Sequence, residues 1–435
     1  MPSLRTLGLA AGLSLPLMAS ASFFTWQAVE LPASTGAACG DGSPYRFFVN
    51  RNPFTTKTVV IFEGGGACWD QNACAGKGEG PLGLSILSAS NPNGIPKDYM
   101  TNPLNVFNGG LSGLALGGLI TPFSMRLHPL QRVQTQGWNI VYAPYCTGDV
   151  HTGNKVTSYT DANAAQPRVQ YHRGSANGLA MANWLGANLK RPDQLLVTGF
   201  SAGGAGATAN YTWLRLAMNP KKSAMLADSG PLFQVNRTDS PEVSPSVFLH
   251  NKIRNVWGLD GQNGLVTKLL TMYPNAGTAE NLGSLSTGLG KIFPQDRFNF
   301  SVFQQDGIYS AFSYTSFYPE IAAAPSGVTR DTLINQKWSL EVNKWVDAMK
   351  PVPNIGFHVP YYRDFLKSHT LTTVTFAGTG IKEANIGSLN AVVDNLIDGS
   401  GTPIRAFETQ KNLQNTRVPG FIDSLLQPVF KLLGL

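Results

Sequence analysis

A serine held between glycines is the residue in this sequence best suited to covalent chemistry. Residues 199–203 read G-F-S-A-G, with Ser201 at the centre. The run Gln194–Val197 before it predicts a strand, and the small residues from Ala205 to Leu216 predict a helix. A tight strand-to-helix turn of this kind is a nucleophile elbow, which exposes the serine hydroxyl at the end of a sheet. The alternative is the same turn with a serine that takes no part in catalysis.

A glycine-rich segment follows an earlier predicted strand. Residues 57–62 read K-T-V-V-I-F, and residues 63–69 read E-G-G-G-A-C-W. Backbone N–H groups can approach an oxyanion closely only where no side chain intervenes, which glycine allows. We therefore predict an oxyanion hole formed by the N–H groups of Gly65, Gly66 and Ala202. A phosphate-binding loop is disfavoured because no Gly-Lys-Ser/Thr follows and no G-x-G-x-x-G opens a helix. A plain loop is the remaining alternative.

The general base that activates a serine is expected to be a histidine, and the chain has six. In α/β-hydrolases the chain order is serine, acid, histidine, so the base should follow Ser201. This leaves His250, His358 and His369. His250 lies in a predicted insertion, and His358 alternates with apolar residues as a core side chain would. His369 lies in a polar loop and is the preferred base.

The acid that orients this histidine should follow a late strand. A strand-like run ends at Asp306, and a helix-like run begins at Ile308. We predict that Asp306 is the acid, with a helix N-cap as the alternative role. Asp228, at the end of the strand after the serine's helix, is the rival acid. Asp149 and His151 alone are too few ligands for a metal site, so Asp149 is expected in the pocket wall.

Strands and helices alternate along the chain, which favours an α/β fold with a mostly parallel sheet and helices on both faces. We predict an α/β-hydrolase-like domain with long loop insertions at residues 70–135 and 232–295, over the carboxyl edge of the sheet. The expected strands are Tyr45–Val49, Thr58–Phe62, Asn139–Ala143, Leu195–Gly199, Ala224–Ala227, Asn299–Gln304 and Ile355–Val359. The expected helices are Arg173–Leu189, Ala205–Met218, Gln336–Met349 and Ser388–Leu396.

The N-terminus has the features of an export signal. Arg5 precedes the apolar run Leu7–Met18, and Ala19-Ser20-Ala21 matches an A-x-A cleavage site. We predict a signal peptide over residues 1–21 and one domain over residues 22–435, in a secreted or periplasmic protein. The chain has 435 residues, 43% of them hydrophobic and 14% charged, which suits one large core. Leu111–Ile120 is too short to span a membrane.

The cysteines and the charge agree with an exported protein. An even number of cysteines favours disulfides after export, and the four are Cys39, Cys68, Cys74 and Cys146. Cys68–Cys74 with Cys39–Cys146 is the first pairing considered, and Cys68–Cys146 is an alternative. A zinc site is disfavoured because no histidines stand at finger spacing. The net charge of +7 suits an anionic polysaccharide or an acidic surface, but the charges are scattered and specify no partner. No nucleic-acid motif is present.

Taken together, these motifs resemble the pectin acetylesterase family, which includes the Notum carboxylesterases. The matching segments are residues 62–69, 145–150 and 199–206, together with Ala227–Gly230 and Ser368-His369. The resemblance runs in order over nearly the whole mature chain. Gly66-Ala67 stands where plant and animal members carry an aromatic residue, so the chain is more similar to the bacterial members.

The resemblance implies a serine esterase that needs neither a metal nor a cofactor. It also implies that His369 is the base and that the acid lies at a strand-to-helix junction such as Asp306. We therefore predict a Ser-His-Asp carboxylesterase that removes acyl groups, acetyl above all, from polysaccharide. Its substrate would be an acylated carbohydrate or a small ester, and we expect a monomer without stable membrane insertion. The alternatives are an esterase for lipid, aryl or polyester substrates and a non-catalytic carbohydrate-binding relative.

Overall fold

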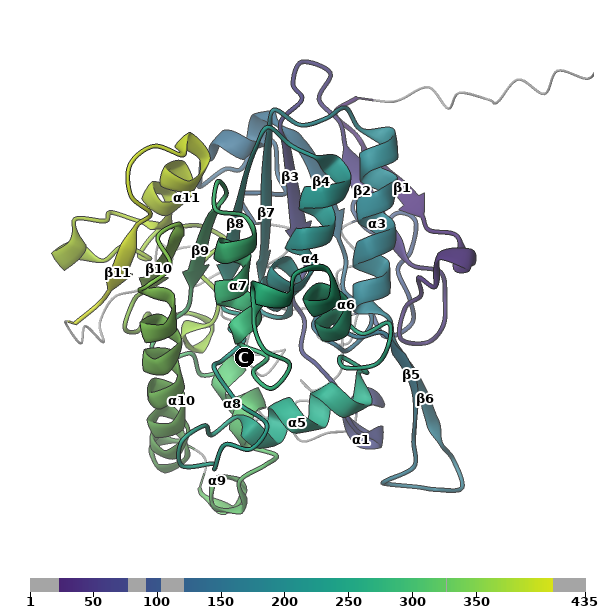
Figure 1. Cartoon of the computed structure of the whole chain (residues 1–435), viewed down its shortest axis with the longest axis vertical. Helices are drawn as coiled ribbons and strands as arrows, with labels where there is room; N and C mark the ends of the chain where they lie inside the picture. Colours follow the sequence, from purple (N-terminus) through teal and green to yellow (C-terminus); the bar gives the residue numbers. More distant parts are fainter. Residues whose placement is uncertain (1–22, 77–90, 103–120, 326, 410–435) are drawn as a thin grey trace, which may run out of the picture.

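One large sheet organises the chain. The computed structural model describes residues 23–76, 91–102, 121–325 and 327–409, so the predicted signal peptide and the apolar run Leu111–Ile120 lie outside the described residues. Within these ranges, nine strands pair in the order β1-β2-β4-β3-β7-β8-β9-β10-β11 (Figure 1). Their bounds are β1 Trp26–Glu30, β2 Arg46–Asn50, β3 Thr58–Phe62, β4 Asn139–Ala143, β7 Gln194–Phe200, β8 Lys222–Asp228, β9 Arg297–Ser301, β10 Ile355–Val359 and β11 Arg405–Phe407.

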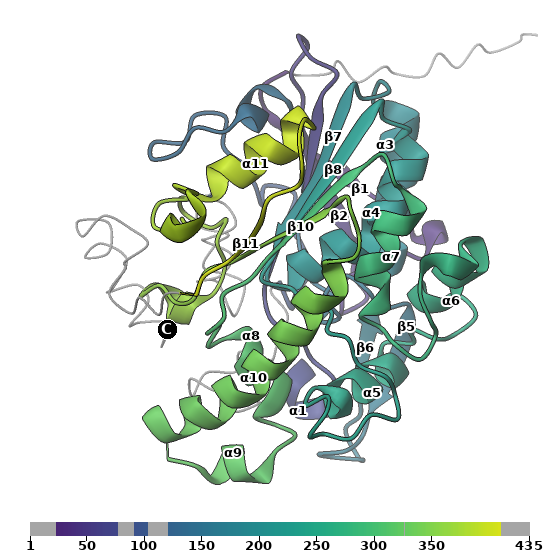
Figure 2. The same cartoon turned by 60° about the vertical axis from the view of Figure 1, so that its left-hand side comes forward.

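The sheet is parallel from β4 to β11, and only β1 and β2 run antiparallel to their neighbours. Every residue of β3, β4 and β7 is buried. Helices α3 (Gly174–Asn188), α4 (Ala202–Met218) and α7 (Ser284–Ile292) lie on one side of the sheet, and α11 (Leu389–Asp398) lies on the other (Figure 2). Because both faces are covered, the central strands are continuous apolar runs, as expected of a parallel sheet.

The shorter helices gather mainly beyond the carboxyl ends of the strands. Figure 1 shows α1, α5 and α8 below the sheet, at the end where β7 leads into Ser201. The remaining helices in the described part are α1 Gln71–Cys74, α5 Val247–Val256, α6 Leu265–Met272, α8 Tyr309–Tyr314, α9 Pro319–Ala323 and α10 Val328–Met349. No helix among the described residues is both long and apolar enough to cross a membrane.

The predicted fold class is confirmed, and the strands that the sequence did not predict lie at the edges of the sheet or outside it. Strands β3, β4 and β10 have the predicted bounds. The sequence did not predict β1, which is half-exposed at the edge, or the separate hairpin of β5 (Lys155–Tyr159) and β6 (Arg168–His172). The helix predicted over Arg173–Leu189 is observed as α3, and His172 before it ends β6. Short or exposed strands carry too few buried residues to produce a clear apolar period.

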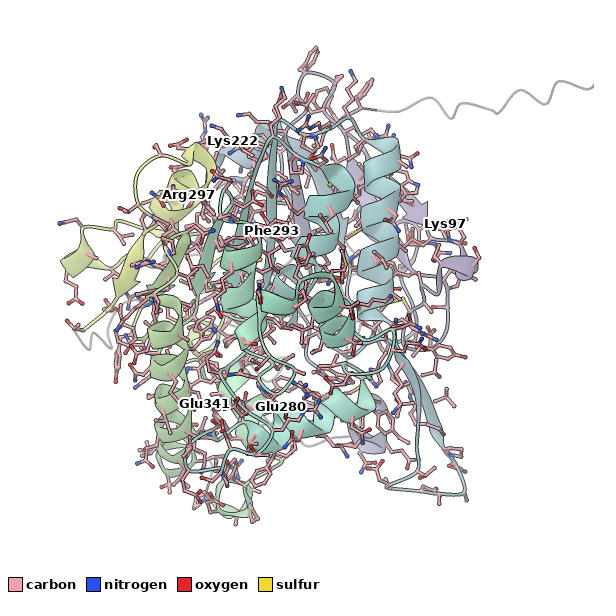
Figure 3. All side chains as sticks on the ribbon, viewed as in Figure 1. Lys97, Lys222, Glu280, Phe293, Arg297 and Glu341 are labelled. Atoms are coloured by element: carbon pink, nitrogen blue, oxygen red, sulfur yellow. A yellow bond between two sulfur atoms is a disulfide. The ribbon has the colours of Figure 1, made fainter. Side chains whose placement is uncertain are left out.

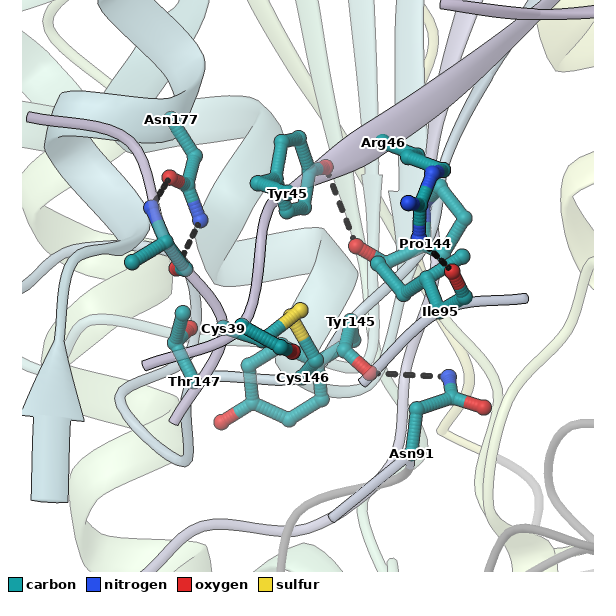
Figure 4. The surroundings of a disulfide bond; sticks show 12 residues. Cys39, Tyr45, Arg46, Asn91, Ile95, Pro144, Tyr145, Cys146, Thr147 and Asn177 are labelled. Carbon is teal, nitrogen blue, oxygen red and sulfur yellow. Dashed lines mark hydrogen bonds between the residues drawn. A yellow bond between two sulfur atoms is a disulfide. The ribbon is translucent and has the colours of Figure 1, made fainter. Parts of the chain in front are cut away.

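Two disulfides pair all four cysteines. Cys39 is bonded to Cys146, and Cys68 is bonded to Cys74, which is the pairing considered first from the sequence. The first bond joins the segment before β2 to the loop that follows β4. Figure 4 shows, beside this disulfide, the Tyr45 hydroxyl donating to the Pro144 carbonyl oxygen. The second lies in the glycine-rich segment and the short helix after it. Disulfides of this kind are typical of proteins that fold in an oxidising compartment.

Candidate active site

Ser201 stands at the turn between β7 and α4, in the conformation of a nucleophile elbow. Its φ of 55° and ψ of −126° lie outside the regions that side chains favour. The glycines nearby make the turn possible. A Cβ on Gly203 would lie 2.0 Å from the carbonyl oxygen of Phe62, and one on Gly199 would lie 2.1 Å from that of Gly203. The Ser201 N–H donates to the Asp228 carbonyl oxygen at 2.9 Å, which fixes the turn to β8.

The glycine-rich loop leaves β3 beside this elbow. A Cβ on Gly64 would lie 2.7 Å from the carbonyl oxygen of Phe200, so the loop and the elbow are in direct contact. Gly65 and Gly66 have φ angles of 137° and 75°, which glycine adopts readily. Among the described residues, the N–H groups of Gly65, Gly66 and Ala202 have no hydrogen-bond acceptor. Free donors beside a serine are what an oxyanion hole requires.

The predicted base and acid are in contact. His369 Nδ1 lies 2.8 Å from Asp306 Oδ2 and 3.0 Å from Oδ1, and both residues are fully buried. The other ring nitrogen, Nε2, is buried without a partner among the described residues. The carboxylate also accepts the N–H groups of Ile308 and Tyr309 at the start of α8. Asp306 therefore caps that helix and orients a histidine at the same time.

The loop that carries His369 is strained and firmly held. Leu366, Lys367 and Ser368 all have positive φ angles between 46° and 58°. Such backbone persists only where the surroundings hold it. The Ser368 hydroxyl accepts from the Arg363 N–H and donates to the Arg363 carbonyl oxygen, both at 2.7 Å. The Arg363 guanidinium forms a buried ion pair with Glu408 at 2.9 Å.

Asp228, the rival acid, contacts the backbone beyond the histidine. Its carboxylate accepts the N–H groups of Leu371 and Thr372, each at 2.8 Å, and the Thr372 hydroxyl at 2.7 Å. The Ser229 hydroxyl accepts the Thr370 N–H at 3.2 Å. Burial raises the pKa of Asp228, and these hydrogen bonds oppose that shift. Asp228 thus anchors the loop of His369, a role that the sequence analysis did not identify.

A narrow cavity opens beside Ser201. Gly66 and Ala202 line it, so two of the three predicted oxyanion donors face the same space as the serine. The free volume is about 50 Å³. Because one water needs at least about 10–15 Å³ on this scale, the cavity has room for only a few waters. The walls are mostly apolar and come from the glycine-rich segment, the loops after β4 and β8, and the helices α5 and α8 with their flanking residues: Ala67, Trp69, Val150, Pro231, Leu232, Phe233, Leu249, His250, Ile253, Trp257, Tyr309, Phe312 and Ser313.

The remaining histidines have other surroundings. His250 lines the cavity, but its Nδ1 has no partner in the described part of the chain, and burial lowers its pKa to about 3. His358 bonds the Thr379 carbonyl oxygen at 2.7 Å inside β10. The ring of His172 lies near the Cys68–Cys74 disulfide, whose bonded sulfurs are not thiolate ligands. The ring of His369, in contrast, contacts a carboxylate directly.

A larger hollow, of about 500 Å³, lies at the other end of the sheet. It is lined by the first residues of three strands, Gln194, Lys222 and Arg297. Figure 3 shows Lys222 and Arg297 near the upper end of the molecule, whereas Glu280 and Glu341 lie in the lower half. The hollow contains none of the predicted catalytic residues, so we place the site at the cavity beside Ser201.

Asp149 and Glu63 are two buried carboxylates beside the glycine-rich loop. Asp149 accepts the backbone N–H groups of His151, Gly153 and Gly174, and so it organises a turn. We expected Asp149 in the pocket wall, but it is not among the residues that line the cavity. Glu63 accepts from the Tyr99 hydroxyl at 2.6 Å and the Tyr145 N–H at 2.8 Å. Burial raises the pKa of Glu63 to about 7, against the opposing effect of these hydrogen bonds.

The raised pKa of Glu63 predicts a loss of stability with rising pH. In the unfolded chain this carboxyl releases its proton near pH 4.5, whereas in the folded protein it holds the proton until about pH 7. The folded state therefore binds more protons across this window, so the free energy of unfolding falls as the pH rises through it. Glu63→Gln should lose this dependence, because the amide does not titrate.

Thermal melts at pH 5 and pH 8 test this expectation. Between pH 5 and pH 8, the melting temperature of the wild type should fall by a few degrees more than that of Glu63→Gln. Glu320→Gln is the matched control, because Glu320 is half-exposed beside Lys337. If the melting temperatures of Glu63→Gln and wild type change equally from pH 5 to pH 8, Glu63 does not titrate in this window.

Comparison with known proteins finds one family model and one curated relative that match part of the chain. The sequence model of the Pectinacetylesterase family matches residues 133–263, which include Ser201 but neither Asp306 nor His369. Palmitoleoyl-protein carboxylesterase NOTUM of Drosophila melanogaster is 24% identical over 233 residues, covering 52% of this chain. The chain spans only 30% of the length of that relative.

A solved structure agrees with the architecture of the sheet and its helices. The structure of the Wnt deacylase Notum from Drosophila matches with a TM-score of 0.57 and 18% identity, over 90% of this chain and 99% of that chain. At this identity the likeness establishes the fold, which is that of a Notum-like α/β-hydrolase. The match to the Pectinacetylesterase family model lies around Ser201, and the chain is similar to the Notum carboxylesterase over about half of its length.

Proposed function

We propose that this protein is an exported serine carboxylesterase that removes small acyl groups, acetyl above all, from polysaccharide. Ser201 is the nucleophile, His369 the base and Asp306 the acid that orients it. The observation that carries the proposal is the state of His369. Asp306 occupies Nδ1 and leaves Nε2, the nitrogen that must accept the serine proton, without a partner among the described residues.

The reaction follows from this arrangement in two halves. Ser201 Oγ attacks the ester carbonyl carbon as its proton passes to His369 Nε2. The charged imidazolium is stabilised by Asp306, and the N–H groups of Gly65, Gly66 and Ala202 bind the oxyanion. The intermediate collapses, and the alcohol leaves with the proton from Nε2. Water then attacks the acyl-enzyme through the same base, which releases the acid and restores the serine.

The cavity supports a small acyl group. Its free volume of about 50 Å³ is room for only a few heavy atoms, and a sugar would meet walls with few hydrogen-bonding groups. We therefore place the acyl group in the cavity and the saccharide outside it. The predicted signal peptide and the two disulfides support export, to the periplasm or outside the cell.

An alternative substrate class is favoured by the aromatic side chains in the wall. Trp69, Trp257 and Phe312 offer apolar surface that would suit aryl esters or longer acyl chains. In this case the sugar would not be required. A series of p-nitrophenyl esters of increasing acyl length distinguishes the two, together with acetate release from acetylated pectin, xylan and chitin fragments.

We expect kcat/KM to fall at least about tenfold between the acetyl and the octanoyl ester, because the longer chain exceeds the space beside Ser201. Phe312→Ala should widen the cavity and raise the octanoyl rate relative to the acetyl rate. Phe54→Ala is the control, because Phe54 is 87% exposed and does not line the cavity. A rate that rises with chain length in the wild type would favour the alternative substrate class instead.

A further inference from the structure

His151 lies in the turn between β4 and β5, in a backbone conformation that needs support. Val150 and His151 have φ angles of 47° and 60°, where side chains rarely occur and β-branched ones least of all. The turn is held by the Asp149 carboxylate, which accepts the His151 N–H at 3.1 Å and that of Gly174 at 2.8 Å. Backbone held in this way is often found where a side chain must keep one position.

The imidazole of His151 bonds the strand end that leads into the glycine-rich loop. Its Nε2 lies 2.8 Å from the carbonyl oxygen of Glu63, the residue immediately before Gly64. A carbonyl oxygen can only accept, so Nε2 carries the proton. The ring is also packed against Phe62 and Tyr145, with centroids 5.2 Å and 4.7 Å away.

The same residue is bonded to the helix that begins after Ser201. Asn210 Nδ2 in α4 donates to the carbonyl oxygen of His151 at 3.0 Å. The ring lies directly against this helix, because a Cβ added to Gly206 would be 2.7 Å from His151 Cδ2. One buried residue therefore contacts both halves of the proposed oxyanion hole: the loop that supplies Gly65 and Gly66, and the helix that begins at Ala202.

The chemistry of the ring makes this link insensitive to pH in the ordinary range. Burial lowers the pKa of His151 to about 4, so the ring is neutral and keeps its Nε2 proton for the Glu63 carbonyl oxygen above that pH. The ring contacts the aromatic rings of Phe62 and Tyr145 and the backbone carbonyl oxygen of Glu63, and the Asp149 carboxylate accepts the backbone N–H of His151. His151 is thus suited to a fixed geometric task and unsuited to proton transfer.

We infer that His151 is a positioning residue of the oxyanion hole. Its ring hydrogen bond to Glu63 and its backbone hydrogen bond from Asn210 fix the glycine-rich loop at a set distance from α4. The N–H groups of Gly65 and Gly66 then converge with that of Ala202 on one oxygen. This inference rests on the proposed function, and it concerns the tetrahedral intermediate and the transition states on either side of it, because the oxyanion is present there and absent from the bound ester.

Two substitutions of His151 in the full-length protein test the inference. His151→Phe keeps a ring and removes the donor, so kcat should fall about 10–100-fold with KM nearly unchanged, because misplaced donors weaken oxyanion binding. A trifluoromethyl ketone, which forms a tetrahedral adduct with the serine, should bind more weakly by a similar factor. His151→Gln keeps an N–H donor, although the glutamine side chain places it differently from the imidazole. Its kcat should lie between those of His151→Phe and the wild type.

His358→Phe is the matched control. His358 is equally buried, bonds a backbone carbonyl oxygen through Nε2 and has a pKa lowered to about 4, but it lies in β10 away from the loop. It should lower the melting temperature as His151→Phe does, with kcat close to wild type. If His151→Phe does not fold, Asn210→Ala tests the inference in its place, because it removes the second link. Asn210→Ala should lower kcat and should weaken binding of the trifluoromethyl ketone by a similar factor.

The outcomes separate the inference from the function on which it rests. A wild-type protein without esterase activity would contradict the proposed function itself. An active wild type in which His151→Phe, or Asn210→Ala in its place, retains the kcat and inhibitor affinity of the His358→Phe control would overturn the inference alone. A drop in kcat without a matching loss of inhibitor affinity would also overturn it, because the defect would then lie outside the oxyanion hole.

Discussion

Ser201→Ala should abolish ester hydrolysis and leave the fold intact. Removing the serine of a triad lowers kcat by roughly 10⁶ in another hydrolase, because no other group forms the acyl-enzyme. Alanine has a Cβ like serine, so it meets the same demand from the φ of 55° at this turn. Turnover of p-nitrophenyl acetate, together with labelling by a fluorophosphonate probe, measures the effect.

The control for this variant is Ser223→Ala. Ser223 is also buried, but it accepts a hydrogen bond from the Tyr211 hydroxyl in the core beside β8. Its substitution should lower the melting temperature slightly and leave turnover unchanged. Retention of activity or of probe labelling by the Ser201 variant would remove the elbow from the mechanism. Absence of both in the wild type would favour the non-catalytic carbohydrate-binding alternative.

His369→Ala and Asp306→Asn should have the next largest effects. Loss of the histidine removes the base, and kcat should fall about as far as for the serine. Asp306→Asn should cost on the order of 10⁴, because an amide stabilises the wrong tautomer of the imidazole. Asparagine keeps an oxygen that can accept the N–H groups of Ile308 and Tyr309, so helix α8 should keep its start.

Asp228→Asn distinguishes this assignment from its rival. It replaces the carboxylate that accepts the N–H groups of Leu371 and Thr372, so we expect a lower melting temperature and at most a moderate loss of rate. Circular dichroism melts and steady-state kinetics on the same preparations measure both. If Asp228→Asn eliminates turnover while Asp306→Asn stays within about tenfold of wild type, the acid lies one strand earlier than proposed.

Local sequence predicted the parts of the site that depend on local geometry. The elbow could be expected because glycines flank Ser201, and the structure shows why larger residues would collide with Phe62. Asp306 could be nominated because it follows a predicted strand, and His369 because it lies in a polar loop after Ser201 in the chain. Their contact at 2.8 Å is a product of the parallel sheet, whose carboxyl ends share an edge.

The supporting residues could not be predicted because their roles exist only between distant segments. Asp228 bonds the Leu371 N–H, 143 positions later, and Asn210 bonds His151, 59 positions earlier. Nothing in the neighbourhood of either residue specifies such a partner. The helices α5 and α6 were missed for a related reason. They are short segments among glycine, proline and asparagine, and tertiary packing stabilises them more than propensity does.

The order of the strands gives the two sides of the site unequal resistance to heat. Ser201 follows β7, which has four strands on each side of it in the sheet, whereas His369 follows β10, and only the three-residue β11 lies beyond that strand. The outer strands of a sheet open locally at a lower free energy than its centre does. Mild heating should therefore free the segment that carries His369 while the strands around Ser201 stay paired, and cooling should restore the proposed activity without a refolding step.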